Sequence, residues 1–351
     1  MGKKTGFVAL LLGVFLLGIA VLAKFYAYDE LAVVPLDQDT ETVSKTAPGD
    51  DATYLNVGAT GGPAVETGPL ESRRTVVGKV ELSEEASEDL DEDVAVWDTF
   101  SYTAPPGTAA EDALSATRDL VPFDRHTAET VRWSGAMTES GGQTIQPFSF
   151  SGNYFKFPFN TQKESVEFWD GSVRKAVPAE YEATEEIEGL TVYRFVQTIE
   201  PVQIATQEVP GSLVGEDVAS LNAERIYSNT RTLWVEPETG VIIKGQEEQF
   251  ATLEVDGSPR LTITDATLGY DEETVSATVD EYESKAMLLG LVRTEIPVVA
   301  TVLGVLLVLL GGFLLLRANR SGSTPSDDDT PAEPGPADGE TAAGGRRKAT
   351  A

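Results

Sequence analysis

An uncharged apolar run of twenty residues, Pro297–Leu316, constrains this chain more than any other feature of its sequence. Glu295 and Arg317 bracket the run closely. A helix of that length rises about 1.5 Å per residue and spans roughly 30 Å, the thickness of the hydrocarbon core of a bilayer. Pro297 suits the first helical position, where its missing N–H would have had no partner. The run therefore predicts a membrane-spanning helix over residues 296–316.

A second apolar run, Phe7–Ala23, lies near the start of the chain, between Lys3 and Lys4 on one side and Lys24 on the other. A signal peptide is one interpretation, because small residues close to Lys24 suit a cleavage site. The seventeen residues of the run exceed the usual core of roughly 7–15, however, and an aromatic flank follows, as at a membrane interface. We expect an uncleaved transmembrane helix over residues 7–27.

Basic residues at the outer end of each run predict the topology, because cytoplasmic flanks of membrane helices are enriched in Lys and Arg. Residues 1–6 and 317–351 are expected in the cytoplasm, and residues 28–295 on the other side of the cell membrane. The segment Ser321–Thr350 is rich in Pro, Gly, Ala, Asp and Glu, has little to bury, and is predicted to be disordered.

The part of the chain between the two runs is strongly acidic. The totals are 26 Lys and Arg and 57 Asp and Glu; without Lys3, Lys4 and the five basic and six acidic residues after Leu316, they are 19 and 51, a net charge of −32. Such a charge argues against nucleic acid or anionic headgroups as partners, because both attract clustered Lys and Arg. The absence of cysteine excludes disulfides, thiolate metal sites and cysteine nucleophiles.

Short alternating segments and turn signals predict a mainly β domain over residues 28–295, an α+β fold flanked by two transmembrane α-helices. Phenylalanines recur at every second position within Pro147–Phe159, which predicts strands with one apolar face. That face is interpreted as sheet core, with a lipid-binding groove as the alternative. Further strands are expected at 74–82, 94–102, 190–195 and 259–264, and a hairpin at 152–171.

A second hairpin is expected from Thr230–Glu236 and Val241–Val255, because proline and glycine stand at the turn positions that favour them between the two segments. Glu273–Val292 is predicted to be a helix, since apolar residues recur along it at steps of three and four. The apolar stripe is expected to dock on the sheet, and pairing with a second copy of the chain is the alternative.

No catalytic constellation is evident. His126 is the only histidine, so histidine-based zinc sites are not expected and a serine triad would depend on this residue alone. The glycines of Gly58–Gly62 lack the following Lys and Ser or Thr of a phosphate loop. The sequence predicts no enzyme activity and no catalytic, cofactor-binding or metal-binding residue.

The segment Glu84–Asp93 holds seven acids in ten residues. We expect a solvated, mobile loop here. Calcium binding is the functional alternative, since carboxylate oxygens suit that ion, although the spacing of an EF-hand is missing.

Four stretches together resemble a known family: Pro122–Trp133, Gly152–Phe159, Gly189–Phe195 and Arg231–Gly245. The series is similar to an actinobacterial family of membrane proteins of unknown function that carries the label PorA-like porin. The resemblance covers nearly the whole chain except the tail, and it implies a cell-envelope location and no established catalytic residue. Ala128 departs from the pattern, since members tend to have glycine in the turn at that place.

These features favour a bitopic cell-envelope protein whose acidic domain has a non-enzymatic binding or organising role. The main alternative is an oligomeric, cation-preferring pore, and the third is a carrier of an apolar or lipid ligand. The lipid bilayer is the expected partner and nucleic acid is excluded, whereas assembly into a homo-oligomer stays open.

Overall fold

The computed structural model describes residues 2–320, which form two compact units. One unit comprises the start of the first helix and the end of the last, within Met1–Leu16 and Leu303–Ala351. The other comprises Leu17–Val302. The segment Ser321–Thr350, predicted to be disordered, lies outside the described residues.

Helices occupy both ends of the described chain and strands its middle. The helical segments are α1 (Gly2–Leu22), η1 (Ala23–Ala27), α2 (Tyr28–Leu31), α3 (Val80–Leu90), η2 (Ala110–Asp112), η3 (Gly211–Leu213), α4 (Glu272–Gly290), η4 (Leu291–Glu295) and α5 (Ile296–Arg320). The strands are β1 (Asp39–Lys45), β2 (Ala52–Asn56), β3 (Ala64–Gly68), β4 (Glu71–Gly78), β5 (Val94–Ala104), β6 (Ser115–Asp124), β7 (Met137–Ser140), β8 (Gln143–Ile145), β9 (Val166–Asp170), β10 (Lys175–Ile187), β11 (Leu190–Pro210), β12 (Ser220–Val235), β13 (Ile242–Val255) and β14 (Ser258–Tyr270).

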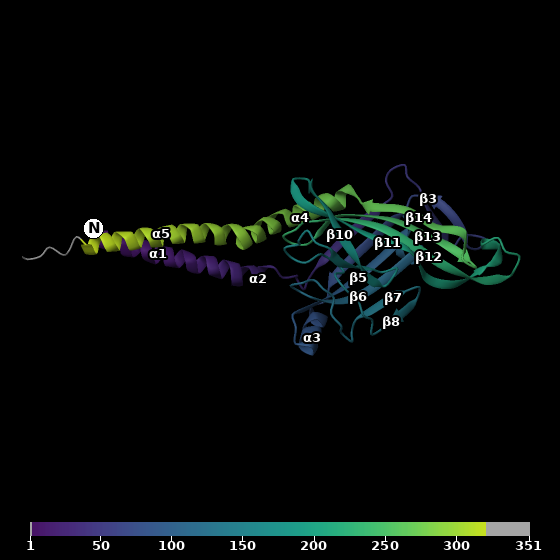
Figure 1. Cartoon of the computed structure of the whole chain (residues 1–351). Helices are drawn as coiled ribbons and strands as arrows, with labels where there is room; N and C mark the ends of the chain where they lie inside the picture. The colour runs from purple at the N-terminus through teal and green to yellow at the C-terminus, as the bar shows by residue number, and fades with distance from the viewer. Residues whose placement is uncertain (1, 321–351) are drawn as a thin grey trace, which may run out of the picture. The chain divides into compact units, whose positions relative to one another are not determined.

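A sheet of 14 strands makes up the body of the larger unit (Figure 1). Twelve of them follow in the order β8-β7-β6-β5-β4-β1-β14-β13-β12-β11-β10-β9, and β2 and β3 branch from β14. Every pair of neighbours in this path is antiparallel, and most are joined by short connections. The predicted mainly β domain with two long apolar helices is confirmed.

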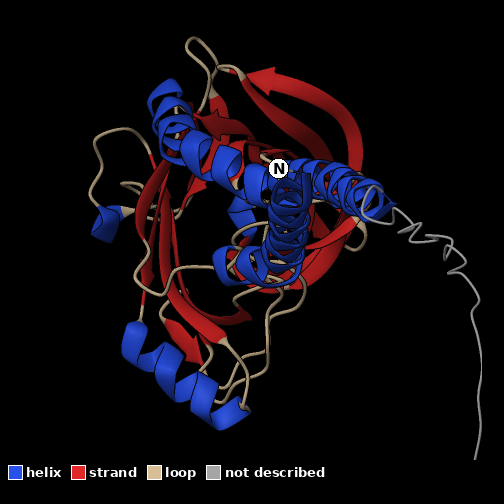
Figure 2. Ribbon diagram, turned by 90° about the vertical axis from the view of Figure 1, so that its left-hand side faces the viewer, coloured by secondary structure: helices blue, strands red, loops and turns tan. Residues whose placement is uncertain are grey.

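The loop around Asn153 joins the two halves of this sheet. Asn153 forms a parallel bridge with Phe168 of β9 and an antiparallel bridge with Glu129, and the adjacent Thr130 bridges Phe123 of β6. The backbone N–H of Asn153 donates to the Glu167 carbonyl at 2.8 Å. The loop therefore links β9, at one end of the strand order, to the region beside β6, near the other end. The two groups of strands are drawn as red ribbons in Figure 2.

The hairpin of β12 and β13 confirms the prediction from its turn residues. Gly240 in the turn has φ of +72°, a conformation that residues with a side chain rarely adopt. A Cβ atom at Gly240 would also meet the Phe157 carbonyl oxygen at 2.1 Å. Glycine is therefore needed here both for the turn and for the close approach of the neighbouring loop.

Helix α4 docks on the sheet through its apolar stripe, as expected. Val275 and Val279 pack with Val192 and Ile243 in one buried cluster. The side chain of Asp271 caps the helix by accepting a hydrogen bond of 2.9 Å from the backbone N–H of Thr274. The cap satisfies an N–H that would otherwise lack a partner in the first turn.

The predictions for Pro147–Phe159 and for a hairpin over 152–171 are wrong. No strand lies between β8 and β9; the hairpin is instead formed by β9 and β10, and Pro147–Phe159 is an irregular loop. Its phenylalanines do not share one face, because they insert into different clusters. Phe157 packs with Phe195, whereas Phe155 packs with Trp97 and Phe123.

The prediction of a mobile loop for Glu84–Asp93 is also wrong, since most of the segment belongs to α3. Ala86 is fully buried against Val94 and Val96 of β5. The indole N–H of Trp133 donates to Asp89 at 3.0 Å. The acidic residues thus occupy the solvent side of an amphipathic helix whose other side packs on the domain.

Candidate functional site

Two helices are long and apolar enough to cross a membrane, within Lys3–Leu31 and Glu272–Asn319. In the smaller unit, which holds the first part of α1 and the last part of α5, these helices touch backbone to backbone. A Cβ atom at Gly13 would lie 2.7 Å from the Gly304 carbonyl oxygen, and one at Gly311 would lie 2.7 Å from the Gly6 carbonyl oxygen. The pairing of residue 13 with 304 and of residue 6 with 311 makes the helices antiparallel. Small residues at such contacts let helices in lipid approach closely.

The outward sides of this helix pair are apolar. Large side chains that are half or more exposed there are Phe7, Val8, Leu11, Leu12, Val14, Phe15, Leu306, Leu309, Leu310, Phe313 and Leu316. Such a surface suits contact with lipid tails or with other apolar helices. The backbone contact at Gly13 and Gly304 leaves no room for water between the two helices there.

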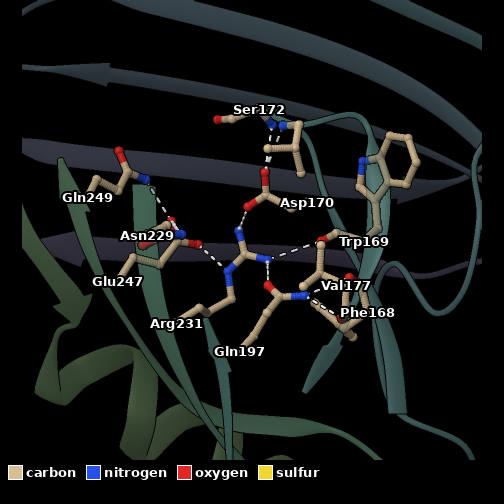
Figure 3. A network of polar contacts seen from close by, with 11 residues as sticks. Phe168, Trp169, Asp170, Ser172, Val177, Gln197, Asn229, Arg231, Glu247 and Gln249 are labelled. Carbon is tan, nitrogen blue, oxygen red and sulfur yellow. Dashed lines mark hydrogen bonds and ion pairs between the residues drawn. The ribbon is translucent and has the colours of Figure 1, made fainter. Parts of the chain in front are cut away.

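The interior of the domain holds a buried network of charges around Arg231 (Figure 3). Its guanidinium donates to Glu247 at 2.7 Å and to Asp170 at 3.1 Å. It also donates to the side-chain oxygen of Gln197 at 2.9 Å and to the Trp169 carbonyl at 3.0 Å. These contacts join β12 to β13, β11 and the end of β9, so one side chain ties together four strands.

Electrostatics keep this network charged. Burial alone would lower the pKa of Arg231, but Glu247 and Asp170 outweigh that effect and raise it. Burial likewise favours protonation of Glu247, and the nearby Arg231 outweighs it, so the pKa of Glu247 is lowered. Arg231 and Glu247 are therefore both charged and compensate each other, which is typical of a structural core of buried charges.

His126, the residue on which a serine triad would have depended, lies in an exposed turn. Its Nε2 is 3.4 Å from the Asp93 carboxylate. The carboxylate of Asp124 accepts hydrogen bonds from the backbone N–H groups of His126 at 3.0 Å and Thr127 at 2.7 Å. Ala128 completes the turn with φ of +60°, so the turn forms although alanine stands where glycine was expected. These contacts give His126 a place in a turn, with Asp124 and Asp93 as its neighbours.

The phenylalanines proposed as one face of a lipid-binding groove do not form such a face, and Phe157 lies in a filled cluster. Phe157 is completely buried, and its ring centroid lies 4.6 Å from that of Phe195 and 5.2 Å from that of Phe168. The core interpretation therefore holds for Phe157. Among residues 2–320, no group of three or more His, Cys, Asp or Glu side chains is arranged to hold a metal ion. This includes the acidic residues of α3, for which calcium binding was the functional alternative.

Sequence reasoning missed the Arg231 network. Alternation along β12 indicates that Arg231 and Leu233 share a face, but it does not indicate which carboxylates from other strands meet the guanidinium. The one sequence signal for a buried charge was that Arg231 alternates with the apolar residues Leu233 and Val235, which places an arginine on the inward face of the strand.

Comparison with known proteins places the chain in a family. The sequence model of the Porin PorA family matches residues 5–313, which include both apolar runs and the whole domain between them. A protein of Corynebacterium resistens named Porin PorA is 25% identical, with 60% of this chain and 69% of that protein covered. Another of Corynebacterium amycolatum, also named Porin PorA, is 24% identical, with 71% and 78% covered. The chain described here belongs to the Porin PorA family.

Proposed function

We propose that this chain is a pore-forming protein of the cell envelope, in which several copies assemble to conduct cations. The observation that carries the proposal is the family match over residues 5–313, which covers both apolar helices together with the domain. The two relatives are named porins. The comparisons favour this function over the binding or organising role, which they do not confirm.

Several copies are needed because one copy offers no path for water. The two helices meet through Gly13 and Gly304 without space between them, and their outward side chains are apolar. A narrow hydrophobic passage tends to exclude water. The conducting path therefore runs between helix pairs of neighbouring copies rather than within one pair.

The charge of the domain predicts the preference for cations. The chain between the runs carries a net charge of −32, and gathering several such domains around a mouth raises the local concentration of cations. Helix α3 contributes exposed carboxylates, including Glu84, Glu85 and Glu88. Both termini are assigned to the cytoplasm and residues 28–295 to the outer side of the membrane, in agreement with the basic residues at the outer ends of the runs.

Recordings from the purified full-length chain in a planar bilayer test the proposal. We expect stepwise conductance with a reversal potential that reports cation preference. Replacing Glu84, Glu85 and Glu88 by Gln is expected to reduce that preference, whereas the same change at Glu167, Glu180 and Glu186, exposed acids elsewhere on the domain, leaves more of it intact. Silent bilayers that contain correctly inserted protein would overturn the proposal.

A further inference from the structure

A polar cavity of about 420 Å³ lies in the larger unit, beside the chain that leads into α5. Its walls are the loop over residues 160–164, Tyr193 of β11, the turn between β12 and β13, and Arg293 of η4. Arg293 stands three residues before Ile296, the first residue of the predicted span. A span that begins at Ile296 would bring the cavity close to the membrane surface.

The walls of the cavity are held in place by the backbone. The N–H of Thr161 donates to the Pro237 carbonyl at 2.7 Å, and the N–H of Asn160 donates to the Glu238 carbonyl at 3.1 Å. The side chain of Glu238 in turn accepts a hydrogen bond of 2.8 Å from Nε of Arg293. Loop, turn and helix therefore form one connected frame, which is suited to bind a ligand without rearrangement.

Two cations line this frame, and one of them lacks a carboxylate. The ammonium of Lys163 lies over the rings of Tyr193 and Tyr181, at 5.0 Å and 5.5 Å from their centroids. Within residues 2–320, no ion pair joins Lys163 to an acid, although Glu164 is its neighbour in the wall. The tyrosine rings position the ammonium and leave its hydrogen-bond donors available to an anion.

A buried hydroxyl group without a hydrogen-bond partner lies near the Arg293–Glu238 pair. The hydroxyl of Tyr28 is buried without a hydrogen-bond partner, and it interacts electrostatically with both Glu238 and Arg293. Tyr28 follows the predicted first span as Arg293 precedes the second. Tyrosine and arginine at the ends of membrane helices commonly lie at the headgroup level.

We propose that this cavity binds the phosphate of an anionic phospholipid, with Lys163 as its cationic contact; Arg293, held by both oxygens of Glu238, fixes the opposite wall. The net charge of −32, which argues against anionic headgroups for the domain as a whole, also repels dissolved anions; a lipid is favoured over a free phosphate at this one cavity because a bilayer holds its headgroups at its own surface. The inference rests on the membrane insertion in the proposed function, and it does not depend on conduction.

Lipid retention by the full-length chain tests this site. The protein is placed in nanodiscs of phosphatidylcholine with a small fraction of phosphatidylglycerol, and the lipids that remain bound are counted by native mass spectrometry. We expect phosphatidylglycerol to be enriched over its bulk fraction, and Lys163→Gln to lower that enrichment about fivefold to tenfold, the effect of one charge-assisted contact. Lys163→Arg should preserve it.

Lys285→Gln is the matched control. Lys285 also lies over a tyrosine ring, at 4.3 Å from the centroid of Tyr282, but it is paired with Glu281 at 2.8 Å and does not line the cavity. This variant should retain phosphatidylglycerol like the wild type. An unchanged melting temperature of Lys163→Gln shows that its fold is intact.

Three outcomes would overturn the proposal. Equal retention by Lys163→Gln and the wild type would exclude Lys163 as the contact. Equal retention of phosphatidylcholine and phosphatidylglycerol would exclude an anionic headgroup. Displacement of the lipid by millimolar glycerol phosphate would assign the cavity to a dissolved phosphate. A chain that retains the lipid but does not conduct would leave this inference standing and contradict only the proposed pore.

Discussion

The guanidinium of Arg231 lies 3.1 Å from the carboxylate of Asp170, whose side chain is only 1% exposed, although the two residues are 61 positions apart in the sequence. This pair fixes the end of β9 to the middle of β12. The contact therefore ties the last strand of the path directly to β12, three places away in the order β12-β11-β10-β9.

Arg231→Met is expected to destabilise the domain strongly. Removing one partner of a buried ion pair leaves Asp170 and Glu247 without compensation, which costs about 3–5 kcal/mol. Urea unfolding of the full-length chain in detergent measures the effect. The double variant Arg231→Met with Asp170→Asn should recover part of the loss, and two variants of equal stability would contradict the assigned pairing.

Lys156→Met is expected to stabilise the chain, and more so at low pH. The Lys156 amine is buried without a hydrogen-bond partner, and burial lowers its pKa to about 7. The unfolded chain therefore binds more protons than the folded chain between about pH 7 and pH 10.5, so wild-type stability rises with pH across that window and the penalty is complete below it.

The Phe159 ring, whose centroid is 3.5 Å from the Lys156 amine, offsets part of this penalty. We expect a gain of roughly 2–4 kcal/mol at pH 6 that largely disappears at pH 10. Melting temperatures of the wild type and Lys156→Met across this range check the sign. A difference that is constant with pH would show that the amine titrates normally.

Trp234→Ala is expected to lower the free energy of unfolding by about 3 kcal/mol. The indole N–H donates to Glu185 at 2.8 Å, the Lys244 amine lies 4.6 Å from the ring centroid, and the ring packs beside the cluster that holds α4. Trp234→Phe retains an aromatic ring and loses the hydrogen bond, so its loss should be nearer 1 kcal/mol. An unchanged melting temperature in Trp234→Ala would point to a role outside the core.

Some of the fold follows directly from sequence and some does not, for identifiable reasons. The turn between β12 and β13 carries proline and glycine at fixed positions, and these are local signals. The period-two phenylalanines of Pro147–Phe159 gave the same signal as a strand, yet Phe150 packs against Trp169 at 5.3 Å between centroids and Phe155 against Trp97 at 5.0 Å. Which surface a loop residue meets is set by distant strands, and alternation does not encode it.

The acidic segment shows the opposite error. The prediction considered only the number of charges in the segment and therefore overlooked the buried side of α3. On that side, Ser83 and Ala86 are buried at a helical step of three residues. The hydroxyl of Ser83 also accepts a hydrogen bond of 2.8 Å from the N–H of Val96. Small buried residues contribute little to hydropathy, so the periodicity is visible only when the spacing is tested as well as the composition.

Gly13→Leu is expected to disrupt the helix pair, because even a Cβ atom at this position would lie 2.7 Å from backbone atoms of α5. Gly312→Leu is the matched control, since a Cβ atom there meets nothing within 4 Å in the described structure. Thermal unfolding in detergent and protease resistance of the helices should fall for Gly13→Leu and remain near wild type for Gly312→Leu. Equal losses would attribute the effect to hydrophobic bulk rather than to contact.

The proposed topology predicts which introduced cysteines react with a reagent that cannot cross the membrane. Because the chain contains no cysteine, each introduced cysteine is the only site that can be labelled. Val218→Cys, at an exposed position of the domain, should react with a membrane-impermeant maleimide in sealed spheroplasts. Asn319→Cys, beyond the second span, should react only after permeabilisation. The reverse pattern would invert the topology, and reaction of both in sealed spheroplasts would exclude a spanning helix.

The bridge at Asn153 also limits how copies of this protein can associate. Within the described chain, it occupies the outer side of β9, the other end of the path is the three-residue β8, and the branch ends in the five-residue β3. Short or covered edges do not extend a sheet from one molecule into the next. At these three ends a second copy finds little edge to pair with. Within the described residues, however, the stretch 180–187 of β10 extends beyond β9 and is paired only with β11, so this stretch, rather than the ends of the path, is where a strand of another molecule has an edge to join.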